Sequence, residues 1–167
     1  MEKQDHHGER CVTEPRWLNE TERQAWLSLL AVVLIGMPQL ERTFRPHGLV
    51  HIEYGLLAAL SDRPEGARLR DLAAVMNMSQ SRLSHRMRKL VERGYVEVHD
   101  DATDGRVSIA RITPVGRRFA AKVAPDHVAD VRRLIFDHLT ERQVAALADA
   151  LGTVAEQLGA CRPEEVP

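Results

Sequence analysis

The chain has 167 residues, a formal net charge of −1 and 44% hydrophobic residues. This length is typical of one domain, or of one domain with additional helices, and the hydrophobic content is sufficient for a core. The first ten residues are polar, and the most apolar run, residues 27–37, is too short to span a bilayer. We therefore expect a cytoplasmic protein with no membrane partner. Two cysteines, Cys11 and Cys161, are too few and too terminal for a disulfide framework.

Residues 1–15 are polar, and we expect a flexible tail there. The next segment, residues 16–48, is predicted to contain one long helix over residues 17–45, kinked at Pro38, which cannot donate a backbone hydrogen bond. Its apolar side chains recur at alternating spacings of four and three, as in a coiled-coil seam, at Trp26, Leu30, Val33, Met37, Leu40 and Phe44. The middle of the helix is apolar on almost every face, so it must be covered on several sides. A second copy of the chain is the simplest cover.

Residues 49–113 form the predicted central module. The module begins with a short helix over residues 50–60. Two further helices, over residues 70–76 and 79–93, are joined by a tight turn at residues 77–78. This arrangement is typical of a helix-turn-helix.

The helix over residues 79–93 has two different sides. Ser79 is a suitable N-cap, and Gly94 is a suitable residue to end the helix. One side is apolar and is expected to face a core through Leu83, Met87 and Leu90. The opposite side is polar, with small side chains near the N-terminus and cations further along. A helix that contacts base edges and phosphates in a major groove needs this distribution.

Two β-rich runs follow, over residues 95–99 and 107–112, with a hydrophilic loop between them. Short strands on either side of a polar loop predict a β-hairpin, here a wing beside the helix-turn-helix. The sequence Thr113-Pro114 is a suitable helix start, because proline at the first helical position needs no N–H. We expect this helix to run to residue 138, with a bend or a short break at Pro125.

Thr140 is expected to cap the last helix. The apolar residues of that helix again alternate in steps of three and four, at Val144, Leu147, Leu151, Val154 and Leu158. The C-terminal helices thus occupy residues 114–160, and residues 161–167 form a polar tail. The sequence therefore predicts a mainly α fold with a small β-hairpin wing, in which a winged helix-turn-helix module is flanked by N- and C-terminal dimerisation helices.

The charge distribution agrees with this division. Residues 68–118 carry 11 Lys or Arg and 6 Asp or Glu, a balance of +5, whereas the rest of the chain has a balance of −6. A basic module on an acidic body is suited to binding duplex DNA.

Three parts of the sequence resemble the MarR family of bacterial transcriptional regulators. They are the helix-turn-helix over residues 72–87, the wing sequence Asp104-Gly-Arg106, and the sequence Thr113-Pro-Val-Gly116 that follows the wing. The resemblance covers roughly residues 17–158. It implies a homodimer, joined by the terminal helices, that binds double-stranded DNA at a pseudo-palindromic operator, most often as a repressor. His85 stands where the family more often has arginine, which bears on base preference.

We expect the polar side of the second helix and the wing to contact DNA. The helix residues expected there are Ser79, Gln80, Ser81, Arg82, Ser84, His85, Arg86, Arg88 and Lys89. Of these, Arg82, Arg86 and Lys89 are assigned to phosphates. In the wing, the resemblance implies that Asp104 orients Arg106, which enters the narrow minor groove. An ion pair within the fold remains an alternative for Arg86, as does a simple loop salt bridge for the wing pair.

The resemblance also implies release from DNA by a small effector, often aromatic or anionic, that binds between the dimerisation helices and the DNA-binding module. Phe44, His51 and Tyr54 are the ligand candidates near that junction. Each of them has ordinary packing as its alternative role.

Two other functions remain open. Peroxide-sensing relatives carry a reactive cysteine inside the first helix, but this chain has Ala25 and Trp26 there, and Cys11 lies upstream. A winged helix used only for protein–protein contact would show no salt-dependent duplex binding. The sequence contains no Gly-rich phosphate loop, CxxC, HExxH or Gly-x-Ser-x-Gly. We therefore predict no enzyme activity, no cofactor and no metal site, and we interpret His6 and His7 as bystanders.

Overall fold

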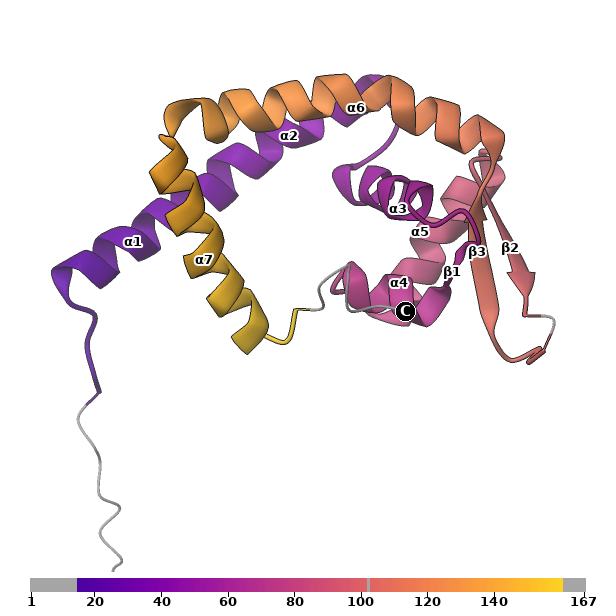
Figure 1. The fold of residues 1–167 in the computed structure, drawn as a ribbon, viewed down its shortest axis with the longest axis horizontal. Helices are drawn as coiled ribbons and strands as arrows, with labels where there is room; N and C mark the ends of the chain where they lie inside the picture. The colour runs from indigo at the N-terminus through magenta and orange to yellow at the C-terminus, as the bar shows by residue number, and fades with distance from the viewer. Residues whose placement is uncertain (1–14, 102, 161–167) are drawn as a thin grey trace, which may run out of the picture.

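The computed structural model describes residues 15–101 and 103–160. Figure 1 shows a compact module and a long, open arm that extends away from it. The module comprises α3 (His51–Ser61), β1 (Ala67–Arg68), α4 (Leu69–Val75), α5 (Gln80–Glu92), β2 (Val96–Asp100) and β3 (Ser108–Ile112). The arm comprises α1 (Glu20–Ala31), α2 (Met37–Phe44), α6 (Pro114–Leu134) and α7 (Glu141–Gln157). The structure confirms the predicted mainly α fold with a small β wing.

The first helix begins at Glu20, three residues later than predicted. Asn19 is its N-cap: the side-chain oxygen accepts from the backbone N–H of Glu22, and the Glu22 carboxylate accepts from the backbone N–H of Asn19, both at 2.9 Å. This reciprocal capping box satisfies two N–H groups that the helix leaves free. A π-helical segment, Val32–Gly36, separates α1 from α2. It lies immediately before Pro38, where the missing N–H interrupts the regular hydrogen-bond pattern.

The helical run from Glu20 to His47 has 28 residues and is, by length and composition, long and apolar enough to cross a membrane. The sequence expectation considered residues 27–37 alone; the longer helix meets this test by length and composition only, which helices of soluble proteins can also meet. Only 11% of its most apolar window is buried within the chain. The arm therefore presents an apolar surface that one chain leaves uncovered.

The module has a closed hydrophobic core. Leu56, Leu57 and Leu60 of α3 are fully buried and pack with Leu72 of α4 and Leu90 of α5. Gly94 has a φ of 69° directly after α5, as predicted for the end of that helix.

The wing belongs to a sheet of three strands, in the order β1-β3-β2, with both pairings antiparallel. The β2–β3 register runs from Val96 opposite Ile112 to Asp100 opposite Ser108. The two predicted strands of the hairpin are present, but the prediction missed the third strand, β1. This strand has only two residues, Ala67 and Arg68. So short a strand shows no alternation of apolar and polar residues that sequence reasoning can detect.

The start of α6 locks the arm onto the sheet. Thr113 caps the helix by accepting from the backbone N–H of Gly116 at 3.0 Å, and its hydroxyl donates to the carbonyl oxygen of Gly94 at 2.7 Å. A Cβ at position 116 would lie 2.1 Å from the carbonyl oxygen of Tyr95, so only glycine fits there. The sequence Thr113-Pro-Val-Gly116 is thus explained by capping at its first residue and close packing at its last.

The helix α6 has no break at Pro125 and ends at Leu134 rather than at residue 138. Pro125 is exposed, so water can satisfy the carbonyl group that loses its partner. The helix ends because Ile135 leaves helical geometry, with φ −128° and ψ −65°, and a 3-10 turn over Phe136–His138 follows. The last helix is capped by Thr140, as predicted, in a capping box with Gln143.

Candidate nucleic-acid interface

The two sides of α5 differ as predicted. Leu83, Met87 and Leu90 are at most 2% exposed and face the core. The exposed side chains of the helix include Gln80, Ser81, Arg82, Ser84, His85, Arg88 and Lys89. Hydrogen-bonding groups and cations therefore lie on the one surface of α5 that the module does not cover. This surface has the size and chemistry that a major groove accepts.

The N-terminus of α5 is fixed by its cap and by the turn before it. The Ser79 hydroxyl lies 3.4 Å from the backbone N–H of Arg82 and 3.2 Å from the Ser81 hydroxyl. Asn77, in the turn after α4, has a left-handed φ of 49°, which asparagine tolerates better than most residues. The start of α5 relative to α4 is therefore set by local backbone geometry.

Arg86 differs from the other cations of α5. Its guanidinium lies 3.1 Å from the carboxylate of Glu53, and Glu53 is only 3% exposed. Lys89 lies 4.0 Å from the same carboxylate and remains about half exposed. The ion pair within the fold, which sequence reasoning gave as the alternative role of Arg86, is thus present in the structure. The sequence contained no signal for the partner, Glu53.

The wing loop is organised by Asp101. Its carboxylate accepts from the backbone N–H groups of Thr103 and Asp104 at 2.8 and 3.2 Å, and from the Thr103 hydroxyl. These hydrogen bonds lower the pKa of Asp101. Sequence reasoning gave this residue no role in the site, although an aspartate two residues before a threonine in a polar loop is a known turn signal.

Asp104 contacts the backbone of Arg106, not its guanidinium. The carboxylate of Asp104 accepts from the backbone N–H of Arg106 at 3.0 Å. Both side chains are exposed, and among the described residues no ion pair joins them. Asp104 thus holds the main chain of the wing at Arg106, and within the part of the chain that the structure describes no carboxylate pairs with the Arg106 guanidinium.

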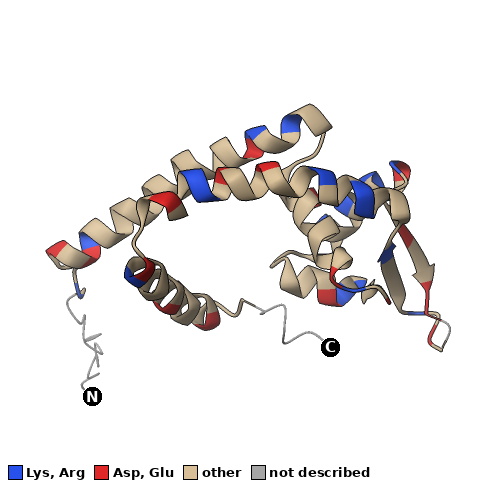
Figure 2. Cartoon of the chain, turned by 45° about the horizontal axis from the view of Figure 1, so that its top comes forward, with Lys and Arg blue, Asp and Glu red and all other residues tan. Residues whose placement is uncertain are grey.

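Charge is distributed unevenly over the molecule. Figure 2 shows Lys and Arg in blue on the helices and strands of the module, whereas the middle of the helical run that contains α1 and α2 is tan. Residues 24–40 contain no charged side chain. The basic surface and the apolar surface therefore lie on different parts of the chain.

The predicted ligand candidates Phe44, His51 and Tyr54 lie together at the junction of arm and module, and His127 of α6 joins them. We call these four residues the junction cluster. The ring centroid of Phe44 lies 5.5 Å from that of His51 and 5.1 Å from that of Tyr54. His127 lies 5.0–5.4 Å from each of the other three rings. His127 had no sequence signal, because its neighbours come from α2 and α3, which are distant in the sequence.

The junction cluster is partly desolvated. Burial raises the pKa of Tyr54. Burial also lowers the pKa of His127, nearby His51 lowers it further, and Asp130 opposes both effects. Among the described residues, the buried Nδ1 atom of His127 has no hydrogen-bond partner. Tyr54 also lines an adjoining groove of about 240 Å³ between α3 and α6.

Cys11 and Cys161, on which the redox alternative depends, lie outside the described residues.

Comparison with known proteins shows the family. A family model described as MarR family matches residues 47–107. No curated protein matches the chain. Among solved structures, AbsC of Streptomyces coelicolor, a MarR family transcriptional regulator, is 36% identical, with a TM-score of 0.82 over 86% of this chain and 98% of that one.

Two further solved structures are informative. Sco3205 of Streptomyces coelicolor, a MarR family regulator in complex with DNA, is 35% identical, with a TM-score of 0.83 over 87% of this chain and 92% of that one. CouR of Rhodococcus jostii RHA1, bound to p-coumaroyl-CoA, is 25% identical, with a TM-score of 0.72 over 81% of this chain and 93% of that one. The sequence identity and the shared fold show that this chain belongs to the MarR family of transcriptional regulators.

Proposed function

We propose that the protein is a homodimeric, sequence-specific repressor that binds a pseudo-palindromic operator and is released by a small molecule. The observation that carries the proposal is the exposed polar and cationic face of α5, opposite a fully buried seam and accompanied by the exposed Arg106 of the wing. The similar regulator Sco3205 has been solved in complex with DNA, which supports the same use of this surface here.

The exposed apolar surface of the arm supports a homodimer. In a single chain, Trp26 is 51%, Leu34 68% and Ile35 62% exposed, and neither α1 nor α7 contains a buried residue. Patches of this extent are rarely left open to water. A second copy would cover both heptad-like seams, so residues 16–48 and 114–160 are assigned to dimerisation. It would also place two α5 helices in major-groove segments about one helical turn apart.

The DNA contacts are assigned by chemistry and position. We assign bases or nearby phosphates to Gln80, Ser81, Ser84, His85 and Arg88 of α5. Arg82 and Lys89 are assigned to phosphates, and Ser79 is placed at the helix start, where it serves as the cap. In the wing, Arg106 is assigned to the minor groove, and Asp104 to holding the loop that presents it.

The effector site is assigned to the junction cluster. Aromatic rings and a buried histidine nitrogen without a partner suit a planar ligand with a polar group. CouR, which shares this fold at 25% identity, has been solved with p-coumaroyl-CoA bound. A ligand can release the operator by stabilising a dimer in which the spacing of the two α5 helices does not match the two half-sites. A coupling free energy of only about 1–3 kcal/mol between ligand binding and DNA binding is sufficient.

Selection of bound duplexes from a random pool, at moderate salt, tests the proposal. We expect one inverted repeat, and we expect Arg106→Ala to weaken its binding. Arg10→Ala, an equal loss of charge within residues 1–15, to which no role in dimerisation or DNA binding is assigned, is the matched control and should leave binding unchanged. Recovery of no motif, or binding that does not depend on salt, would contradict the proposal and favour a winged helix used for protein–protein contact.

A further inference from the structure

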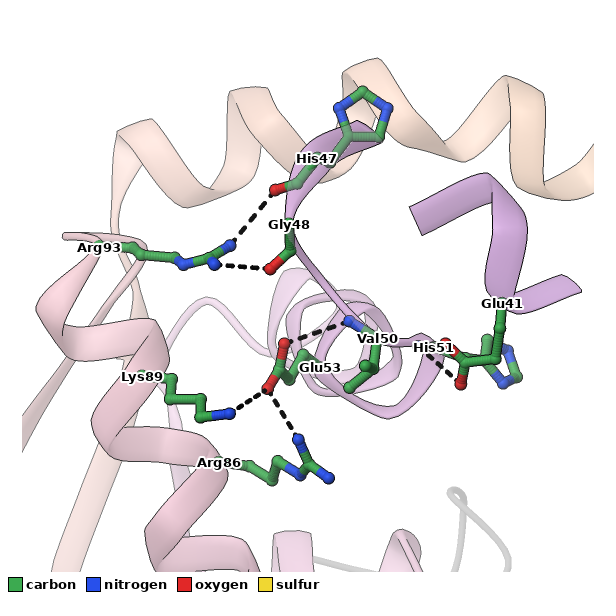
Figure 3. Close-up of polar contacts among 9 residues, drawn as sticks. All are labelled: Glu41, His47, Gly48, Val50, His51, Glu53, Arg86, Lys89 and Arg93. Carbon is green, nitrogen blue, oxygen red and sulfur yellow. Dashed lines mark hydrogen bonds and ion pairs between the residues drawn. The ribbon is translucent and has the colours of Figure 1, made fainter. Parts of the chain in front are cut away.

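Glu53 connects the start of α3 to the middle of α5. It is a charged side chain that is only 3% exposed. One carboxylate oxygen accepts from the backbone N–H of Val50 at 3.2 Å, and the other lies 3.1 Å from the Arg86 guanidinium (Figure 3). A buried carboxylate is stable only when it is paired and hydrogen-bonded, so Arg86 is held in this position by the cost of leaving Glu53 alone.

Arg93 makes a second connection on the same side of α5. Its guanidinium donates to the carbonyl oxygen of His47 at 3.3 Å and to that of Gly48 (Figure 3). Residues 86, 89 and 93 are spaced by three and four, so they form one stripe along the helix. Figure 3 shows this stripe directed toward residues 47–53. Of the three, Arg86 and Arg93 have their guanidinium groups paired with acceptors of residues 47–53, whereas Lys89 remains about half exposed.

Residues 47–53 form the segment through which the arm enters the module. Gly48 has a φ of 64°, and a Cβ there would lie 3.1 Å from the Arg93 guanidinium, so a left-handed glycine lets the arginine approach. On the arm side, the carboxylate of Glu41 in α2 accepts from the backbone N–H of His51 at 3.1 and 3.2 Å. The segment is thus bound to the arm on one side and to α5 on the other.

We propose that Glu53 and Arg93 are positioning residues that fix the angle of α5 relative to the arm, and that Arg86 serves this clamp instead of contacting DNA. This inference rests on the proposed function, because the angle matters only when a dimer must fit two half-sites at once. The clamp determines how strictly the dimer discriminates operators by half-site spacing. Lys89, further from Glu53 and more exposed, stays assigned to phosphate.

The first test compares two arginines of one helix that are four residues apart. The full-length protein is titrated with the selected operator over a range of salt concentrations. Arg82→Gln, at an exposed arginine assigned to phosphate, should lower the slope of log K against log salt by about 1.8, since a dimer loses two contacts of about 0.9 each. Arg86→Gln should leave the slope unchanged. An equal fall in the two slopes would overturn the inference, because it would place Arg86 on a phosphate.

The second test measures spacing. One inserted base pair moves a half-site by about 3.4 Å and rotates it by about 35°. The wild type should bind the selected operator better than operators with one base pair inserted or removed. We expect Glu53→Gln and Arg93→Gln each to reduce that preference, roughly tenfold. An unchanged preference in both variants would overturn the inference and leave these contacts a purely structural role.

A double variant distinguishes a loss of folding from a loss of the clamp. If Arg86→Gln alone does not fold, the double variant Glu53→Gln/Arg86→Gln replaces the ion pair with two neutral amides, and its salt slope is measured instead. It should keep the wild-type slope and lose spacing preference. The wild type is measured first, so a failure to bind duplex DNA would contradict the proposed function before any variant is examined.

Discussion

The module and the arm use apolar residues in opposite ways. In the module, Leu56, Leu57, Leu60 and Leu90 have no exposed surface at all. In the arm, Leu34 and Ile35 are more than 60% exposed, although they are as hydrophobic. Phe44 of α2 and Val123 of α6 also belong to the module's core, whereas α1 and α7 have no buried residue. This difference fits the proposed dimer, in which the module is stabilised within one chain and the outer part of the arm by association.

The largest expected effect comes from placing a charge on the exposed side of the arm. Leu34→Glu would bury two unpaired carboxylates in the proposed dimer, at a cost of several kcal/mol. We expect a monomer by light scattering and at least an approximately 100-fold loss of operator affinity. Val12→Glu, the same kind of change within residues 1–15, to which no role in dimerisation or DNA binding is assigned, is the control. A dimer that survives Leu34→Glu would mean that this surface is covered by something other than a second copy.

The second effect comes from removing volume from the module. Leu90→Ala should lower the free energy of unfolding by about 2–5 kcal/mol, because a buried leucine leaves a cavity. The loss should be the same at low and high protein concentration. Leu34→Ala should instead destabilise more at concentrations near the dimer dissociation constant, since its contacts are made between chains. Urea unfolding at two protein concentrations measures both. An identical concentration dependence of the two variants would remove the distinction between module and arm.

Local signals were predicted well in both parts, because they are contained in a few neighbouring residues. Ser79, Thr113 and Thr140 cap helices as expected, and the seam of Leu83, Met87 and Leu90 is buried. These features depend only on side-chain chemistry at fixed helical spacings.

Features that depend on distant neighbours were not predicted. Nothing in the sequence near Glu53 shows that α5 will cover it, and nothing near His127 shows that it will meet residues of α2 and α3. The strand β1 was missed for the same reason, since its two residues are strand only because β3 lies beside them. The first helical run was predicted over residues 17–45 but spans Glu20–His47. A capping box at Asn19 sets its start, and a 3-10 turn over Arg45–His47 sets its end.

A smaller effect is expected where the arm meets the sheet. Gly116→Ala would place a Cβ 2.1 Å from the Tyr95 carbonyl oxygen, which is backbone and cannot move aside cheaply. We expect a loss of about 1–3 kcal/mol in the free energy of unfolding, as for other overpacked sites. Val115→Ala, one residue away and half exposed, should change stability by less than about 0.5 kcal/mol. Equal effects of the two substitutions would mean that the close approach of α6 to the sheet does not contribute to stability.

The smallest effect is expected at the junction cluster, where the two parts touch. Burial holds the pKa of His127 below its ordinary value of about 6.5, so the unfolded chain takes up a proton at a higher pH than the folded chain. The free energy of unfolding should therefore be undiminished above pH 6.5 and fall as the pH drops below it, through the lowered pKa of the folded state. Urea unfolding between pH 5 and pH 8 should show this slope in the wild type and a shallower one in His127→Phe, which keeps a ring in the cluster. His138→Gln, at an exposed position of the arm, should keep the wild-type slope. A wild-type slope in His127→Phe would assign the acid sensitivity to another group and leave the junction no more sensitive to pH than the arm or the module alone.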